Sequence, residues 1–142
     1  MSYPSKQVVK SIFSHLAAAD FDSFISYAQS DATWSLQSTT PLGTRFNDSK
    51  TFVQKTFGRC SRLMDPAHPV SLLIDNVVGG VDDEWSAIEM HNVAIAKDGQ
   101  AYDQKYAWLV RWSPEGDQSK IMEGRVYLDS ALLERILVSC ES

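Results

Sequence analysis

The chain has little that would support metal, disulfide or nucleotide chemistry. It contains only two cysteines, Cys60 and Cys140, which are too few for a disulfide framework and lack metal-ligand spacing. Its three histidines, His15, His68 and His91, stand far apart, and none belongs to a His-x-x-x-His or Glu-x-x-His pattern. The sequence also lacks a phosphate-binding glycine loop and a Gly-x-Ser-x-Gly motif. We therefore expect a protein that uses no metal and no cofactor.

Positive charge and long apolar runs are also scarce. The chain has 13 Lys and Arg against 18 Asp and Glu, a formal net charge of −5 and a sequence pI near 5.0. Nucleic-acid binders concentrate basic residues on one face, whereas here they are scattered. No apolar run approaches the ~20 residues that span a bilayer, and the N-terminus lacks the apolar core of a signal peptide. We expect a cytoplasmic protein without a nucleic-acid partner or a membrane span.

What the chain does have is enough apolar sequence for one folded domain. Of its 142 residues, 44% are apolar. A chain of this length buries about two-thirds of the surface that it exposes when unfolded, which suffices for one core and a cavity. No repeat, linker or low-complexity tract divides the sequence. We expect residues 1–142 to form a single domain.

The first half of the chain predicts helices. Apolar residues recur at three- and four-residue spacing over residues 6–18, which indicates an amphipathic helix. Asp20 can cap a second, short helix over residues 21–28. A short strand at residues 33–36 follows.

A third helix is signalled further along. The side chains of residues 47–49 offer capping oxygens after a turn at residues 40–43. The apolar residues that follow at helical spacing continue to Met64, and Pro66 ends the helix.

The second half of the chain predicts an antiparallel sheet. Its strand-like segments are residues 70–78, 84–96, 102–112 and 120–128, separated by glycine-containing turns. Strands joined by short turns form a meander, and the helices that precede them must cover one face of the sheet. A final helix over residues 130–138 follows directly. The expected fold class is α+β.

Several short stretches carry a resemblance to a known family. They are Glu89-Met-His91, Asp98-Gly99, the strand from Tyr102 to Trp108, and Arg125-Val-Tyr-Leu-Asp-Ser-Ala-Leu132. The last is similar to the terminal Tyr-Leu-Asp-x-Ala-Leu signature of the SnoaL-like polyketide cyclases, which belong to the nuclear-transport-factor-2-like (NTF2-like) superfamily. The predicted order of helices and strands likewise resembles the cone-shaped fold of that superfamily.

A closer likeness is to the small fungal SnoaL-like enzymes of meroterpenoid pathways. Trp34, Thr40-Pro-Leu-Gly43 and Arg45-Phe-Asn47 fit their pattern. Those enzymes rearrange or cyclise a polycyclic terpenoid intermediate without a cofactor, and members of the family are usually homodimers. The resemblance thus implies a homodimeric, cofactor-free isomerase or cyclase of secondary metabolism, acting on an apolar polycyclic substrate. A hydrolase or dehydratase with the same cavity and a non-catalytic ligand-binding or dimeric scaffold module remain alternatives.

Strand alternation suggests which residues form the site. It groups Trp85, Glu89 and His91 on one face, Gln104, Tyr106 and Trp108 on another, and Arg125, Tyr127 and Asp129 on a third. If these faces point into the cone, they bring together the carboxylates, imidazole and phenols that general acid–base catalysis needs. We expect Asp129, His91 and Glu89 to be catalytic. The expected substrate-binding residues are Trp34, Phe46, Gln104, Tyr106, Trp108, Arg125 and Tyr127.

Each of these candidates also has a purely structural interpretation. Asp129 directly precedes a helix and can serve only as its N-cap. Glu89 and His91 fit an outer face at a dimer interface equally well, and Arg125 fits a surface ion pair. The aromatic residues can fill the core. Alternation alone does not identify the concave face, because bulges and curvature change the phase of a strand.

Overall fold

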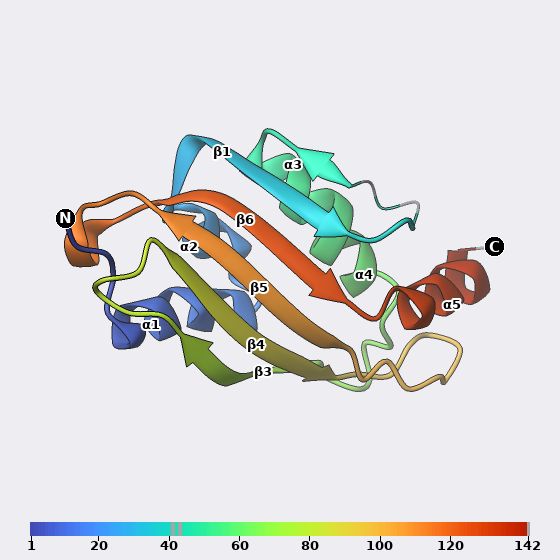
Figure 1. The fold of residues 1–142 in the computed structure, drawn as a ribbon. Coiled ribbons are helices and arrows are strands. Elements are labelled where there is room, and N and C mark those ends of the chain that lie inside the picture. The colour runs from blue at the N-terminus through green and yellow to red at the C-terminus, as the bar shows by residue number, and fades with distance from the viewer. Residues whose placement is uncertain (41, 43, 142) are drawn as a thin grey trace.

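The fold is a single curved sheet covered by helices on one face (Figure 1). The computed structural model describes residues 1–40, 42 and 44–141. Its strands are β1 (Ala28–Gln37), β2 (Arg45–Phe46), β3 (Ser71–Val78), β4 (Trp85–Val93), β5 (Lys105–Trp112) and β6 (Ile121–Leu128), arranged in the order β2-β1-β6-β5-β4-β3.

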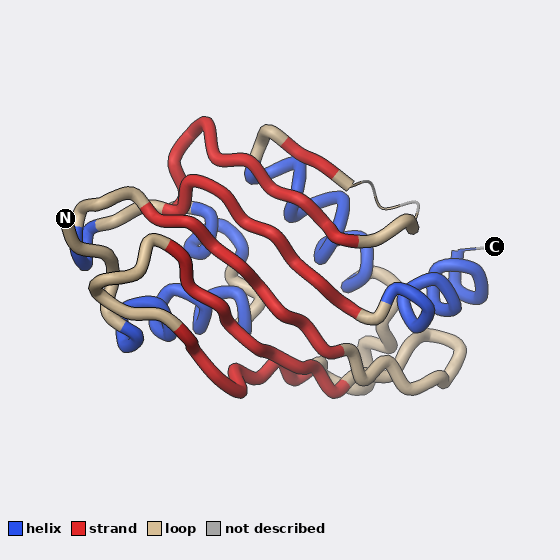
Figure 2. The backbone as a smooth tube through the Cα atoms, in the orientation of Figure 1, coloured by secondary structure: helices blue, strands red, loops and turns tan. Residues whose placement is uncertain are grey.

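The helices lie on one side of this sheet, apart from the last helix, which extends beyond one end of the sheet, and a 3-10 turn at the other end (Figure 2). They are α1 (Lys6–Ala17), α2 (Phe21–Ile25), a continuous segment made of α3 (Ser49–Val53), the π-helical η1 (Gln54–Gly58) and α4 (Arg59–Ser61), a 3-10 turn η2 (Gly116–Gln118), and α5 (Ser130–Glu141). The predicted α+β fold, with early helices over one sheet face and a final helix, is confirmed. The turn expected at residues 40–43 lies partly outside the described residues.

The sheet is mixed rather than wholly antiparallel. Strands β3 to β6 form the predicted antiparallel meander, but β1 pairs with β6 in parallel. The two-residue strand β2, which the sequence did not predict, pairs with β1 at the sheet edge. Nearly ninety residues separate β1 from β6, and local sequence patterns carry no information about so distant a pairing.

Short polar side chains start the helices where the sequence predicted. The Asp20 carboxylate accepts a hydrogen bond from the Ser23 amide at 3.2 Å, and the Asp48 carboxylate accepts one from the Thr51 amide at 2.9 Å. These contacts satisfy amide groups that have no partner within the first helical turn. Both predicted caps are confirmed.

An aromatic cluster around Trp108 joins the helices to the sheet. The Trp108 ring lies 5.6 Å from Phe13 of α1, 6.1 Å from Phe24 of α2 and 5.6 Å from Phe57 of η1, measured between ring centroids. Large aromatic side chains dominate the burial energy of such a core. This cluster fixes the inward face of β5.

Close packing of Trp34 on β6 requires a glycine. A Cβ atom on Gly124 would lie 2.5 Å from two carbons of the Trp34 ring. The ring cannot shift easily, because it stacks on Phe52 with centroids 4.9 Å apart and donates a hydrogen bond to the Ser49 hydroxyl at 2.8 Å. Gly124 therefore matches the space that Trp34 leaves.

Gly124→Ala is expected to lower the free energy of unfolding by about 1–3 kcal/mol, because the added methyl group overpacks the core. Denaturant titration followed by circular dichroism measures this loss. Gly80→Ala is the matched control, since a Cβ there meets nothing within 4 Å. Equal stability of the two variants would contradict the packing argument.

Candidate functional site

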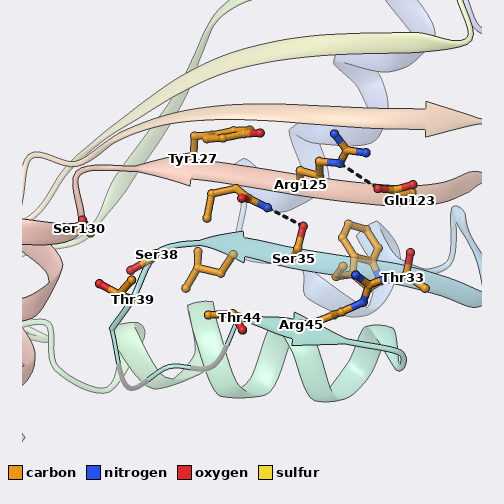
Figure 3. Close-up of a pocket in the computed structure, with 13 residues that line it drawn as sticks. Thr33, Ser35, Ser38, Thr39, Thr44, Arg45, Glu123, Arg125, Tyr127 and Ser130 are labelled. Carbon is orange, nitrogen blue, oxygen red and sulfur yellow. Dashed lines mark hydrogen bonds and ion pairs between the residues drawn. The ribbon is translucent and has the colours of Figure 1, made fainter.

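Two hollows are candidates for the site. The inner cavity, of about 100 Å³, lies between the helices and the sheet, and its lining includes Phe57, Cys60, Asn92, Tyr102 and Tyr106. The outer groove, of about 850 Å³, lies on the opposite face of the sheet along β1 and β6 (Figure 3).

The polar groups of the inner cavity form one connected set. The Tyr102 hydroxyl lies near the Tyr106 hydroxyl and the Cys60 thiol, close enough for both groups to influence its pKa. Burial raises the pKa of both tyrosines, and it raises the pKa of the Cys60 thiol to about 11. All three groups therefore keep their protons at neutral pH and serve as hydrogen-bond donors rather than bases.

Gln104 holds this set in place from behind. Its side chain is fully buried, and Nε2 donates to the Tyr102 hydroxyl at 3.3 Å and to the Asp129 carbonyl at 3.0 Å. Its Oε1 accepts the Lys105 and Asp129 amides at 3.0 and 2.8 Å. Gln104 is thus a positioning residue that joins Tyr102 to the start of α5.

Asn92 supports the same segment from β4. It is 4% exposed and lines the inner cavity. Its Nδ2 donates to the Tyr102 carbonyl at 2.5 Å, and its amide donates to the Gln104 carbonyl at 2.9 Å. These two hydrogen bonds hold the backbone before β5 against β4. Tyr102 therefore continues the alternation of β5 and faces the same side of the sheet as Tyr106.

The sequence did not single out Cys60, Asn92 or Tyr102, which bring polar groups to the inner cavity. Tyr102 continues the alternation of Gln104, Tyr106 and Trp108, so that extending the β5 pattern by two residues would have found it. Asn92 alternates with the buried Met90 in the same way. Cys60 carried no signal beyond its place on an apolar helix face.

Glu89 and His91 do not reach the inner cavity. Ile88, their neighbour on β4, pairs with Trp108 and is fully buried, which turns the adjacent residues toward the outer face. The expectation that the β4 and β5 faces meet in one cavity is therefore wrong. Sequence alternation showed which residues of a strand share a face, but not whether that face points toward the helices.

A bulge in β3 gives both outer residues a partner. The pairing shifts between Ile74 and Asn76, which leaves Asp75 as an extra residue in the strand. The His91 Nδ1 atom lies 2.8 Å from both Asp75 carboxylate oxygens, and Asn76 Nδ2 donates to the Glu89 carboxylate at 3.2 Å. The bulge thus places two polar side chains beside His91 and Glu89 on the outer face.

Arg125 and Tyr127 line the outer groove rather than the inner cavity (Figure 3). Arg125 Nε donates to the Glu123 carboxylate at 2.8 Å, and its guanidinium lies 4.8 Å from the centre of the Trp85 ring. The surface ion pair considered from the sequence is therefore present. Such half-exposed contacts fix side-chain geometry but contribute little stability.

The remaining aromatic candidates belong to the core. Trp34 and Trp108 are each 1% exposed and pack edge-to-face, with ring centroids 6.3 Å apart. Phe46 is half-buried against Phe52, at 5.5 Å. The inner-cavity lining includes none of these three rings. Of the predicted binding residues, only Tyr106 lines that cavity, and Gln104 supports it.

Asp129 acts as a helix cap. Its carboxylate is exposed and accepts the Leu132 amide at 3.1 Å, and it is absent from the inner-cavity lining. The capping alternative thus accounts for its position.

The inner cavity is the better candidate site for an apolar ligand. The outer groove is broad, open and bordered mainly by hydroxyl, amide and charged groups, whereas the inner cavity is mostly apolar with a few converging donors. No group of three metal-ligating side chains occurs within residues 1–40, 42 and 44–141. Over the same residues, no helix is long and apolar enough to cross a membrane.

Two substitutions of Asp129 follow from its role as a cap. Asn can still accept the Leu132 amide, so Asp129→Asn is expected to leave thermal stability nearly unchanged, while Asp129→Ala is expected to cost about 0.5–2 kcal/mol. Thermal unfolding of both variants tests this. A large loss of turnover in a stably folded Asn variant would contradict a role limited to capping and restore the predicted catalytic one.

Comparison with known proteins identifies the fold. No family model matches the sequence. A fungal protein (strain ATCC 74256) named dimerizing cyclase phiC is 25% identical over 136 residues, which cover 95% of this chain but only 58% of that protein, less than two-thirds of its length.

Solved structures match more completely. An NTF2-like protein from Burkholderia thailandensis superposes with a TM-score of 0.74 at 13% identity, covering 93% of this chain and 95% of that one. PrhC from Penicillium brasilianum gives 0.71 at 11% identity, with coverages of 95% and 88%. TerC, co-crystallized with polyporic acid, gives 0.71 at 7% identity, with coverages of 93% and 96%. The chain therefore has the NTF2-like fold.

Proposed function

We propose that this protein is an enzyme of cyclase or isomerase type that binds an apolar ketone in the inner cavity and activates its carbonyl oxygen with Tyr102 and Tyr106. The observation that carries the proposal is that two tyrosines, whose hydroxyls burial keeps protonated, line the same mostly apolar cavity. The relative named dimerizing cyclase supports this reaction type.

The chemistry follows from the protonation state of the two phenols. When a nucleophilic carbon attacks a conjugated ketone, a carbon–carbon bond forms and the displaced electron pair moves to the carbonyl oxygen. Fixed donors in a low-dielectric cavity stabilise that oxyanion far better than water does. The attacking carbon belongs to an enol of the same molecule, whose hydroxyl proton leaves as its own carbonyl forms and is returned to the carbon next to the ketone, so no side chain has to act as a base and the product keeps the mass of the substrate.

The described residues that line the inner cavity include no carboxylate and no imidazole. Proton transfer by Asp129, His91 and Glu89 remains a prediction from the sequence. In this proposal, hydrogen bonds from the two tyrosine hydroxyls activate the substrate instead. A hydrolase is less well supported, since it needs a base that activates water. The resemblance to fungal meroterpenoid enzymes favours a secondary metabolite as substrate.

A non-catalytic ligand-binding module is the second candidate. The observation in its favour is that the Asp129 carboxylate contacts the backbone of α5 instead of a cavity. Incubation with polycyclic ketone intermediates, followed by mass spectrometry, separates the two. Cyclisation or isomerisation changes retention at constant mass, dehydration removes water, and a binding module leaves the ligand unchanged.

Removal of one donor is expected to slow the reaction. Tyr106→Phe keeps the ring and deletes the hydroxyl, so turnover is expected to fall about 10²-fold or more while the fold is retained. Steady-state kinetics on a substrate found in the incubation measures this. Tyr27→Phe is the control, because Tyr27 is not among the residues that line the inner cavity. Equal turnover by the two variants would remove Tyr106 from the mechanism.

We also propose that the protein forms a homodimer through the outer sheet face. Leu73, Val78 and Val93 on this face are each about half exposed, at 48%, 51% and 52%. A stable interface would bury on the order of 1,600 Å² in total. The resemblance to a family of dimers points the same way.

Light scattering at micromolar concentration is expected to give twice the chain mass. Val93→Glu, which places a charge on this face, is expected to shift the protein to monomer. Val138→Glu changes an equally apolar and more exposed residue on α5 and serves as control. A monomer mass for the unmodified protein would refute the dimer.

A further inference from the structure

The outer groove has the volume of a ligand site and a mainly polar border. Its volume of about 850 Å³ falls within the range of small-molecule pockets, which is roughly 300–1,000 Å³. Hydroxyl, amide and charged side chains of β1, β2 and β6, and of the segments that adjoin these strands, make up most of its border (Figure 3). A ligand that matches this groove must therefore be polar.

Strand register places two arginines on the outer face with a serine between them. Ser35 of β1 pairs with Arg45 of β2 on one side and with Arg125 of β6 on the other. Ser35 points outward because the buried Trp34 and Leu36 alternate with it, and paired residues share a face. Neighbouring strands are about 4.8 Å apart, so the Cα atoms of the two arginines are about 10 Å apart.

Contacts on the protein orient the Arg125 side chain in advance. Its Nε donates to the Glu123 carboxylate at 2.8 Å, and its guanidinium lies 4.8 Å from the centre of the Trp85 ring. Neither contact uses the N–H groups of the two terminal nitrogens, which form a fork that binds a carboxylate in bidentate geometry. A side chain that is already held loses less freedom when it binds a ligand.

Positive charge exceeds negative charge along the groove. Glu123 is the only carboxylate among the described residues that line it, and both of its oxygens face guanidinium groups. One oxygen accepts from Arg125, and the other lies 3.7 Å from Arg111 Nε. Arg45 is exposed and forms no ion pair with any residue in 1–40, 42 and 44–141. In a chain of net charge −5, this groove is thus a local site that attracts anions.

The floor between the two arginines supplies a hydroxyl donor. Gln37 Nε2 donates to the Ser35 Oγ atom at 2.9 Å (Figure 3). The Ser35 oxygen therefore acts as the acceptor in this bond, and its own proton can be donated to a ligand oxygen in the groove.

We propose that the outer groove is a second ligand site that binds a dicarboxylate, with one carboxylate on Arg125 and the other on Arg45. One carboxylate fills one guanidinium fork, so two arginines whose backbones are about 10 Å apart match two carboxylates joined by a short chain. That chain lies over Ser35. The groove and the inner cavity are on opposite faces of the sheet, so the inference does not rest on the ketone chemistry proposed for the cavity.

The proposed dimer contact uses a different part of the outer face. Leu73, Val78 and Val93 belong to β3 and β4, and β5 separates these strands from β6, β1 and β2. A dimer formed through β3 and β4 leaves the groove accessible to a small ligand.

Titration of the isotope-labelled protein with adipate and with hexanoate, followed by NMR, tests the site. The two acids have the same chain length, but adipate carries two carboxylates and hexanoate one. The unmodified protein is expected to bind adipate about tenfold more tightly, with shifts of the Ser35 and Arg125 amide signals. Arg125→Gln is expected to weaken adipate binding about tenfold, and Arg45→Gln is expected to remove the preference for adipate over hexanoate.

Two control variants make the test specific. Lys105→Gln removes one positive charge from the same face of the sheet, but Lys105 does not line the groove. Tyr106→Phe alters the inner cavity alone. Both variants are expected to bind adipate as the unmodified protein does. Equal weakening in Lys105→Gln would indicate nonspecific attraction of anions, and weakening in Tyr106→Phe would place the probe in the inner cavity; either result would overturn the proposal.

Two further outcomes would also overturn it. One is equal affinity of the unmodified protein for adipate and hexanoate. The other is absence of adipate binding together with a monomer mass of both arginine variants in light scattering, which would show that a second copy of the chain occupies the groove.

Discussion

The direction in which Trp108 points decides the role of the residues around it. Trp108 faces the helices because Phe13, Phe24 and Phe57 surround it, and each of these rings comes from a different helix. Paired residues in adjacent strands share a face, so Ile88 and Val126 must also point inward. Glu89, His91, Arg125 and Tyr127 alternate with them and must point outward. One aromatic cluster therefore separates the polar side chains of the sheet into an outer set and an inner set.

The sequence predicted the elements of this fold better than the relation between them. Periodicity located the helices and the meander, and Asp20, Asp48 and Asp129 marked helix starts because capping depends on local chemistry. The direction of each strand face depends on the register between strands, which lies outside any single segment. If Trp108 had been assigned to the core, its pairing with Ile88 would have indicated that Ile88 also points inward. His91 and Glu89 would then have been expected to point outward. The β3 bulge at Asp75 and the π turn at Phe57 have no comparable local signature.

Burial also decides what chemistry the inner cavity can perform. The same exclusion of water that strengthens a hydrogen bond to an oxyanion raises the pKa of Tyr102, Tyr106 and Cys60 and removes them as bases. Gln104 acts in the opposite direction, because its Nε2 donates to the Tyr102 oxygen and lowers the pKa of that hydroxyl, but the effect of burial is larger. The site is consequently suited to activating a carbonyl group, and less suited to moving a proton between two side chains.

The outer face of the sheet differs from the inner cavity, because its polar groups are partly exposed to solvent. Its polar contacts, the hydrogen bond of His91 with Asp75 and the ion pair of Arg125 with Glu123, are partly exposed and lie among half-exposed apolar residues such as Val93. Exposed ion pairs add little stability, but they fix the orientation of charges that a second surface must match. Apolar area interspersed with oriented charges is the composition of a protein interface rather than of a pocket for an apolar ligand. His91 and Glu89, which the sequence offered for an acid–base site, are therefore better placed for the proposed dimer interface, while the hydroxyls proposed as donors lie on the face that Trp108 turns toward the helices.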